Sequence, residues 1–185
     1  FISVDRRQQE FSQTLYHLLK SFDSTRLVVG NDGWEMTETD LCAIHNYDHG
    51  EKNDEKAHAK FRESLSCREE LLYTYTAGRK IFVDGWKDRG QPVLLTEFGG
   101  ISFAEQDDKA WGYTCIRDGA ELEKEYERIL DAICASDSIA GFCYTQLADV
   151  EQETNGLLTC DRVPKIRTEI IRKINDRVNK KRIRI

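Results

Sequence analysis

A single carboxylate follows one of the most apolar runs of this sequence. The run Val93–Leu95 leads through a threonine to Glu97, and Gly99 and Gly100 follow after one phenylalanine. The continuous apolar run predicts a strand buried on both faces of a parallel sheet, with Pro92 at its first position. Such a strand would place Glu97 at its carboxyl end, where α/β folds bind their ligands. An ionised glutamate there costs free energy unless it is paired or functional, so Glu97 either binds a neighbouring arginine or does chemistry.

Three further apolar runs are also followed by side chains that can do chemistry. The runs cover residues 26–30, 40–45 and 138–144. The candidate functional residues at their ends are Asn31, Asp32, Trp34, His45, Asn46, Tyr47 and Gln146. Their amide, carboxylate, imidazole and phenol groups are directional hydrogen-bonding partners, and a tryptophan adds a flat apolar face.

The elements that position these residues alternate along the chain. Apolar residues at helical spacing predict helices over about residues 5–22, 54–82 and 118–135, and a last helix after residue 164. Strands that alternate with helices predict an α/β fold with a parallel sheet and right-handed crossovers. Polar and aromatic residues after every strand are typical of the active face of a (β/α)8 TIM barrel. Because only four strands are predicted, the chain would form half of such a barrel.

Composition limits the classes of function. The chain has 185 residues, enough for one domain, and a net charge of −6, which argues against a nucleic-acid partner. Its six cysteines show no spacing typical of a metal site, and we expect reduced thiols, no cofactor and a cytoplasmic location. No membrane-spanning run is present, so no membrane partner is expected. A chain that begins with Phe1 is expected to be a piece of a longer protein.

Several long segments resemble glycoside hydrolase family 2, which includes β-galactosidases, β-glucuronidases and β-mannosidases. They occur in the family's order, at 31–34, 44–47, 92–100, 141–153 and 155–165. The resemblance implies that residues 1–185 are the C-terminal half of a catalytic TIM barrel, with strands five to eight and their helices. The first half of the barrel and the family's β-sandwich domains would lie upstream, outside this chain.

The chemistry implied by the resemblance is retaining hydrolysis of β-glycosides by two glutamates. Glu97 matches the nucleophile, which forms a glycosyl-enzyme ester. Tyr47 matches a residue that hydrogen-bonds that carboxylate. The partner acid of the family lies in an Asn-Glu dipeptide, which this sequence does not contain. We therefore predict that the chain alone does not turn over glycosides at a useful rate.

The resemblance assigns substrate contacts to the other strand-end residues. His45, Asn46, Asn31, Asp32, Trp34 and Gln146 are the predicted sugar-binding residues. For His45 and Trp34, packing at the barrel rim is an equal alternative. Several members of family 2 have a tryptophan near the position of Gln146, so the resemblance does not identify the sugar that is bound. Asp149 and Glu151 are predicted to order their loop, whereas Glu35, Glu38 and Asp40 are predicted to be solvated surface.

Two alternative functions stay open. The chain could belong to another retaining barrel glycosidase, such as a cellulase or mannanase, or it could be a non-catalytic carbohydrate-binding or assembly module. In each case the partner is a carbohydrate. A half-barrel leaves two sheet edges and an apolar interior exposed, so we also expect self-association into a homo-oligomer.

Overall fold

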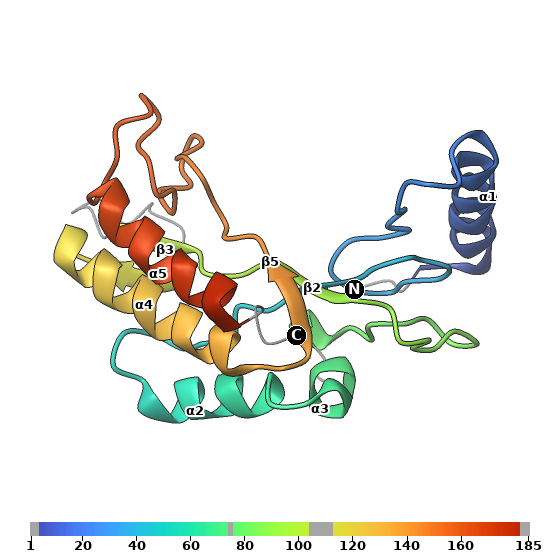
Figure 1. Cartoon of the computed structure of the whole chain (residues 1–185), viewed down its shortest axis with the longest axis horizontal. Helices are drawn as coiled ribbons and strands as arrows, with labels where there is room; N and C mark the ends of the chain where they lie inside the picture. The colour runs from blue at the N-terminus through green and yellow to red at the C-terminus, as the bar shows by residue number, and fades with distance from the viewer. Residues whose placement is uncertain (1–3, 74–75, 104–112, 182–185) are drawn as a thin grey trace.

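The computed structural model describes residues 4–73, 76–103 and 113–181 (Figure 1). Its elements, in chain order, are α1 (Arg6–Phe22), β1 (Cys42–His45), α2 (Glu55–Ser64), α3 (Arg68–Tyr73), the short helix η1 (Thr76–Gly78), β2 (Val93–Glu97), β3 (Ile101–Phe103), β4 (Thr114–Ile116), α4 (Gly119–Ala135), β5 (Ile139–Phe142) and α5 (Thr168–Lys181).

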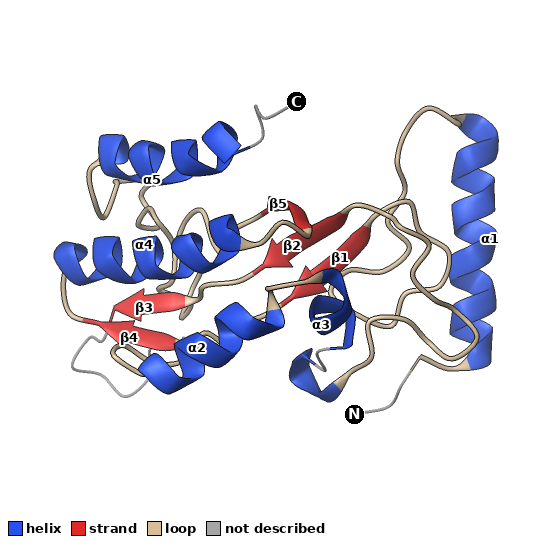
Figure 2. Cartoon of the chain, turned by 60° about the horizontal axis from the view of Figure 1, so that its bottom comes forward, coloured by secondary structure: helices blue, strands red, loops and turns tan. Residues whose placement is uncertain are grey.

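The main sheet is parallel, as the sequence predicts. It has the strand order β1-β2-β5, so the strand that carries Glu97 lies in the centre (Figure 2). Helices α2 and α3 connect β1 to β2, and α4 connects β2 to β5. Strands β3 and β4 form a second parallel pair just beyond the carboxyl end of β2. The predicted α/β class and parallel sheet are therefore confirmed.

The core forms around β1 and β2. All four residues of β1 are buried, which is the pattern of a strand covered on both faces. On β2, Val93 and Leu95 are buried, and on α4 the predicted apolar face is buried as well. Helix α4 starts cleanly because the Asp118 carboxylate accepts hydrogen bonds from the backbone N–H groups of Ala120 and Glu121.

Two predictions about the elements were wrong. Residues 26–30 form no strand, because a ladder needs a neighbouring strand and this stretch pairs instead with Asp40, whose backbone and side chain both bond Val28. The helix predicted over 54–82 is broken into α2, α3 and η1. Near the first break the Ser64 hydroxyl donates to the carbonyl of Phe61, which competes with continuation of the helix.

Helix α1 has its predicted amphipathic pattern but little to pack against. It lies at one end of the molecule, apart from the other helices (Figure 1). Tyr16 is its one buried residue, and the Tyr16 hydroxyl donates to Asp40 at 2.7 Å. Its large apolar side chains are exposed, most of all Phe11 at 64% and Phe22 at 80%. Among the described helices, none is long and apolar enough to cross a lipid bilayer.

Leu95 tests the importance of the central strand for stability. Its side chain is fully buried, so Leu95→Ala leaves a cavity and should lower the free energy of unfolding by about 2–5 kcal/mol. The matched control is Leu147→Ala, because Leu147 is 69% exposed and its truncation should change stability by no more than about 0.5 kcal/mol. Urea unfolding followed by circular dichroism measures both. Equal effects would contradict the assignment of β2 to the core.

Candidate functional site

Pairing between β1 and β2 brings the first two site residues together. The register places His45 opposite Glu97, at the carboxyl ends of both strands. The backbone N–H of Asn46 then donates to the carbonyl of Glu97 at 3.0 Å, which extends the pairing by one residue. Parallel strands end at one edge of a sheet, so side chains far apart in the sequence become neighbours.

Two side chains lie close to one carboxylate oxygen of Glu97. The Tyr47 hydroxyl donates to Oε2 at 2.9 Å, and Nδ1 of His45 lies 3.1 Å from the same oxygen. The Glu97 side chain keeps 40% of its surface exposed. Oε1 is therefore the oxygen left available to a ligand.

A turn after residue 30 lies on the other side of the imidazole ring. Asp32 Oδ1 is 3.3 Å from Nε2 of His45 and also accepts a hydrogen bond from the Thr96 hydroxyl at 2.6 Å. The turn is closed by the side-chain amide of Asn31, which donates to the carbonyl of Trp34 at 2.7 Å. Asn31 thus orders the turn.

The ring of His45 fits closely against this turn. Trp34 meets it edge to face, with ring centroids 5.1 Å apart. Gly33 has φ +91°, and a Cβ atom at this position would lie only 2.7 Å from Cγ of His45. A glycine is required here both by the backbone conformation and by the close approach of the ring.

Two stacked tyrosines form another wall of the site. The rings of Tyr47 and Tyr113 lie 4.0 Å apart and nearly parallel. Burial raises the pKa of Tyr47, and the negative charge of Glu97 raises it further, although a hydrogen bond involving Thr145 opposes this. Tyr47 therefore stays a neutral phenol that can donate its proton to Glu97.

The backbone after Glu97 is fixed by a buried histidine and by a second glycine. Nε2 of His49 lies 2.8 Å from the carbonyl oxygen of Gly99, and burial lowers the pKa of His49, which keeps the ring neutral. Gly99 has φ +96°, and a Cβ there would lie 2.2 Å from the Tyr144 ring. The backbone conformation after β2 is therefore restricted by the His49 contact and by the close approach of Gly99 to the Tyr144 ring.

These side chains surround a cavity of about 360 Å³, within the range of about 300–1,000 Å³ seen for small-molecule sites. It is lined by Trp34, His45, Tyr47, Asp48, Thr76, Ala77, Glu97, Tyr113, Thr145, Gln146 and Glu153. Aromatic faces alternate with carboxylates, hydroxyls and an amide. This mixture can stack on an apolar ring face and bond hydroxyl groups around its edge.

The predicted site residues divide into two groups. Trp34, His45, Tyr47, Glu97 and Gln146 line the cavity. Three others do not line it: Asn31 bonds Trp34, Asp32 faces His45 from behind, and Asn46 is buried, with its side-chain oxygen accepting from the backbone of Asp48. No substrate contact follows from the positions of these three.

Sequence reasoning missed several lining residues. Tyr113 follows the 104–112 stretch and stands at no predicted strand end. Thr76 and Ala77 come from the interior of the predicted long helix, and only its interruption brings them to the site. Glu153 falls within a segment that resembles a known family, and that segment was the one available signal. Asp149 orders its loop by bonding Lys165 and the backbone of Gly156, as its sequence position predicted.

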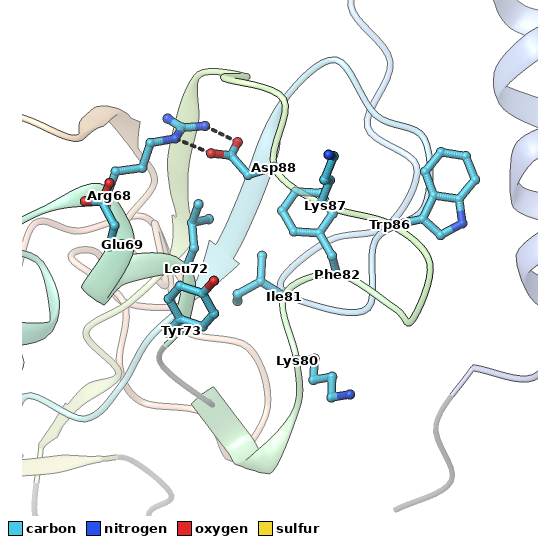
Figure 3. Close-up of a pocket in the computed structure, with 10 residues that line it drawn as sticks. All are labelled: Arg68, Glu69, Leu72, Tyr73, Lys80, Ile81, Phe82, Trp86, Lys87 and Asp88. Carbon is cyan, nitrogen blue, oxygen red and sulfur yellow. Dashed lines mark hydrogen bonds and ion pairs between the residues drawn. The ribbon is translucent and has the colours of Figure 1, made fainter.

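A larger cavity, of about 520 Å³, lies between α3 and residues 80–88 (Figure 3). Aromatic and aliphatic side chains make up half of its lining residues and charged side chains the other half, and two of the charged residues, Arg68 and Asp88, form a two-point ion pair with N–O distances of 2.7 and 2.5 Å. Arg68 also donates to the carbonyl of Gln91. Because these groups are already paired with each other, they do not offer the converging free donors of a catalytic site.

Several solved structures with a fold similar to that of this chain are glycoside hydrolases. No protein-family model matches the sequence, and no curated protein matches it either. A structure of an exo-β-agarase superposes with a TM-score of 0.64 at 13% identity, over 95% of this chain and 23% of that chain. An uncultured Clostridium β-glucuronidase gives 0.58 at 18% identity, over 96% of this chain and 30% of the other.

A third solved structure is a β-galacturonidase of glycoside hydrolase family 2 from Eisenbergiella tayi, bound to glycerol. Its TM-score is 0.56 at 15% identity, over 96% of this chain and 31% of that chain. At such identities the likeness establishes the fold alone. The chain therefore has an α/β fold shared with parts of glycoside hydrolases, and it spans between 23% and 31% of the length of these three structures.

Gly33 offers a test of the packing behind His45. Gly33→Ala should destabilise the protein in two ways, through its positive φ and through the clash with the imidazole ring. Gly85→Ala is the matched control, because Gly85 also has φ +91° but a Cβ added to it would meet no atom within 4 Å. The control should lose about 1–2 kcal/mol, and Gly33→Ala about 1–3 kcal/mol more. Urea unfolding that gave equal losses would contradict the close packing.

Proposed function

We propose that this chain is part of the catalytic domain of a β-glycosidase that acts with retention of configuration, with Glu97 as the nucleophile. The observation that carries the proposal is the asymmetric environment of the Glu97 carboxylate. Tyr47 bonds Oε2, while Oε1 is left available towards a cavity walled by Trp34 and Tyr113. A nucleophile of this class needs a fixed carboxylate with one free oxygen beside a sugar-sized space.

The first step follows from this geometry. Oε1 of Glu97 attacks the anomeric carbon, the bond from that carbon to the leaving oxygen breaks, and a glycosyl ester of Glu97 forms. The Tyr47 phenol stays bonded to Oε2 and keeps the carboxylate plane oriented during the attack. In the second step water attacks the same carbon, the second glutamate of the mechanism accepts the water's proton, and the ester bond breaks to release the sugar and restore the Glu97 carboxylate.

The proton donor is proposed to lie outside this chain. In retaining enzymes the two carboxyl groups are about 5–5.5 Å apart, and the second protonates the leaving oxygen. The resemblance to family 2 implies that this glutamate lies upstream, in the other half of a barrel. Of the four barrel strands that the resemblance assigns to this chain, the one over residues 26–30 is not formed in the described structure. The finer assignments, to family 2 and to a half-barrel, rest on that resemblance and on the similarity to glycoside hydrolase structures.

The residues of the site are compatible with more than one glycone. Gln146 can bond a hydroxyl group, and Trp34 can stack on a ring face. The solved structures similar to this chain are, by name, an exo-β-agarase, a β-glucuronidase and a β-galacturonidase, so they do not single out one glycone. The test therefore uses a panel of sugars.

The nucleophile can be tested without the proton donor. Dinitrophenyl β-glycosides of galactose, glucose, mannose and glucuronic acid have a leaving group that needs no protonation. With the preferred sugar, the chain should release a burst of dinitrophenolate equal to the enzyme concentration and then stall. Azide should restore turnover by attacking the ester, and the product should be the β-glycosyl azide. Nitrophenyl β-glycosides, which depend more on protonation, should react far more slowly.

Two variants test which carboxylate of the cavity is the nucleophile. Glu97→Gln should abolish the burst, whereas Glu153→Gln, which removes another carboxylate that lines the cavity, should keep it. A burst that survives Glu97→Gln would contradict the assignment of the nucleophile. Sugar binding in calorimetry without a burst for any of the four glycosides would favour a carbohydrate-binding module, and efficient turnover of nitrophenyl glycosides would contradict an upstream acid.

We propose in addition that the isolated chain associates with a second copy through α1. The apolar side chains of this helix are exposed over most of its length, including Phe11, Leu18 and Phe22. Exposed apolar surface of this kind favours association in water. Its contact partner in a complete enzyme would be the other half of the barrel.

Light scattering tests this association. The chain should be a dimer or larger at micromolar concentration, and the double substitution Phe11→Lys and Phe22→Lys should shift it towards the monomer. Leu147→Lys is the control, since Leu147 is similarly exposed but lies far from α1 in the sequence. A clean monomer for the unaltered chain over a wide concentration range would contradict the proposal.

A further inference from the structure

We infer that His45 is a positioning residue for Glu97, and that the turn Asp32–Trp34 serves to hold His45 rather than to bind substrate. This inference rests on the proposed function of Glu97. It reassigns Asp32 and His45, whose strand-end positions suggested sugar contacts, to a chain of contacts that runs from Thr96 through Asp32 and His45 to Glu97.

Both nitrogens of the imidazole ring lie close to a carboxylate oxygen. Nδ1 lies 3.1 Å from Oε2 of Glu97, and Nε2 lies 3.3 Å from Oδ1 of Asp32. Nε2 is also covered from solvent and has no aligned hydrogen bond, so a sugar hydroxyl cannot reach it without displacing the turn.

The ring is held on its other sides by packing. Its side chain is 11% exposed, Trp34 meets it edge to face at 5.1 Å, and Gly33 allows the backbone to approach it closely. Arg79 in turn lies over the Trp34 ring, with its guanidinium carbon 5.8 Å from the ring centroid. A side chain fixed in this way can hold a neighbouring carboxylate in one orientation.

Thr96 closes the chain of contacts around the end of β2. Thr96 is the extra residue in the pairing of β2 with β1, because Ile44 lies opposite Leu95 and His45 lies opposite Glu97. Thr96 donates to Asp32, Asp32 faces His45, and His45 faces Glu97. These contacts connect the two last residues of β2 through the turn after residue 30. The charged groups that face His45 directly are Asp32 and Glu97, while Asp48 and Glu153 share the cavity.

Two substitutions of His45 separate its contacts. His45→Asn keeps a nitrogen near the position of Nδ1 and loses the contact with Asp32. His45→Gln keeps a nitrogen near the position of Nε2 and loses the contact with Glu97. In the dinitrophenyl glycoside burst, His45→Gln should lower the first-order rate constant by about tenfold to 100-fold through misplacement of the nucleophile, whereas His45→Asn should lose far less. The concentration of glycoside at half saturation should stay nearly unchanged in both.

Asp32→Asn distinguishes positioning from substrate binding. If Asp32 acts through His45, this substitution lowers the burst rate constant in the unaltered chain and has no further effect in His45→Asn, because the contact is already lost. Thr96→Val should give a smaller loss of the same kind. If Asp32 instead binds the sugar, Asp32→Asn will raise the half-saturating concentration by the same factor in both backgrounds, which would overturn the inference.

A ligand-free measurement tests the inference independently of the reaction. Nitrogen NMR of isotope-labelled histidine in the chain should show that Glu97→Gln and Asp32→Asn each shift the ring-nitrogen signals of His45. The signals of His17, whose side chain is 66% exposed on α1, serve as the internal control and should not move. Unchanged His45 signals in both variants would overturn the inference. A chain that gives no burst with any sugar but shows these shifts would contradict the proposed function and leave the positioning geometry intact.

Discussion

The parallel pairing of β1 with β2 is the interaction on which the site depends. It sets His45 opposite Glu97. The next hydrogen bond, from the backbone N–H of Asn46 to the carbonyl of Glu97, makes the two strands end side by side at the same edge of the sheet. Tyr47 then follows on the correct side to reach the carboxylate. A shift of one residue in this register would turn Glu97 to the opposite face and replace it with Thr96. The buried core of β1 and β2 is therefore what makes the site possible.

Close packing around the strand ends then restricts the site to one arrangement. Gly33 lets the turn after residue 30 meet the His45 ring, and Gly99 lets the chain turn past Tyr144 directly after Glu97. At both positions a side chain would collide with an aromatic ring and would strain the backbone. The result of this packing is a carboxylate with one oxygen bonded by Tyr47, in the fixed orientation that the proposed nucleophile requires.

The sequence predicted the parallel sheet, the central strand and the amphipathic helices because hydrophobic periodicity reports which faces are buried. The sequence predicted less of the structure in segments whose conformation depends on contacts with residues distant in the chain. Residues 26–30 are apolar enough for a strand but have no strand to pair with, and the first part of the helix predicted over 54–82 ends at Ser64, whose hydroxyl bonds a backbone carbonyl. Glu35 and Asp40 were predicted to be solvated, yet Glu35 is buried against Arg79 and Asp40 accepts bonds from Tyr16 and Lys20. Charge alone does not reveal a distant partner. In the same way, no local pattern places Tyr113 against Tyr47.

The central claim is that Oε1 of Glu97 forms a covalent bond to the anomeric carbon of a β-glycoside. The most direct measurement traps this ester with a dinitrophenyl glycoside in which fluorine replaces the hydroxyl next to the anomeric carbon, and then locates the sugar by tandem mass spectrometry of the digested protein. We expect a single modified peptide that contains residues 93–100, with the added mass on Glu97. A sugar attached to Asp48 or Glu153, or an unmodified protein with every glycone of the panel, would contradict the claim.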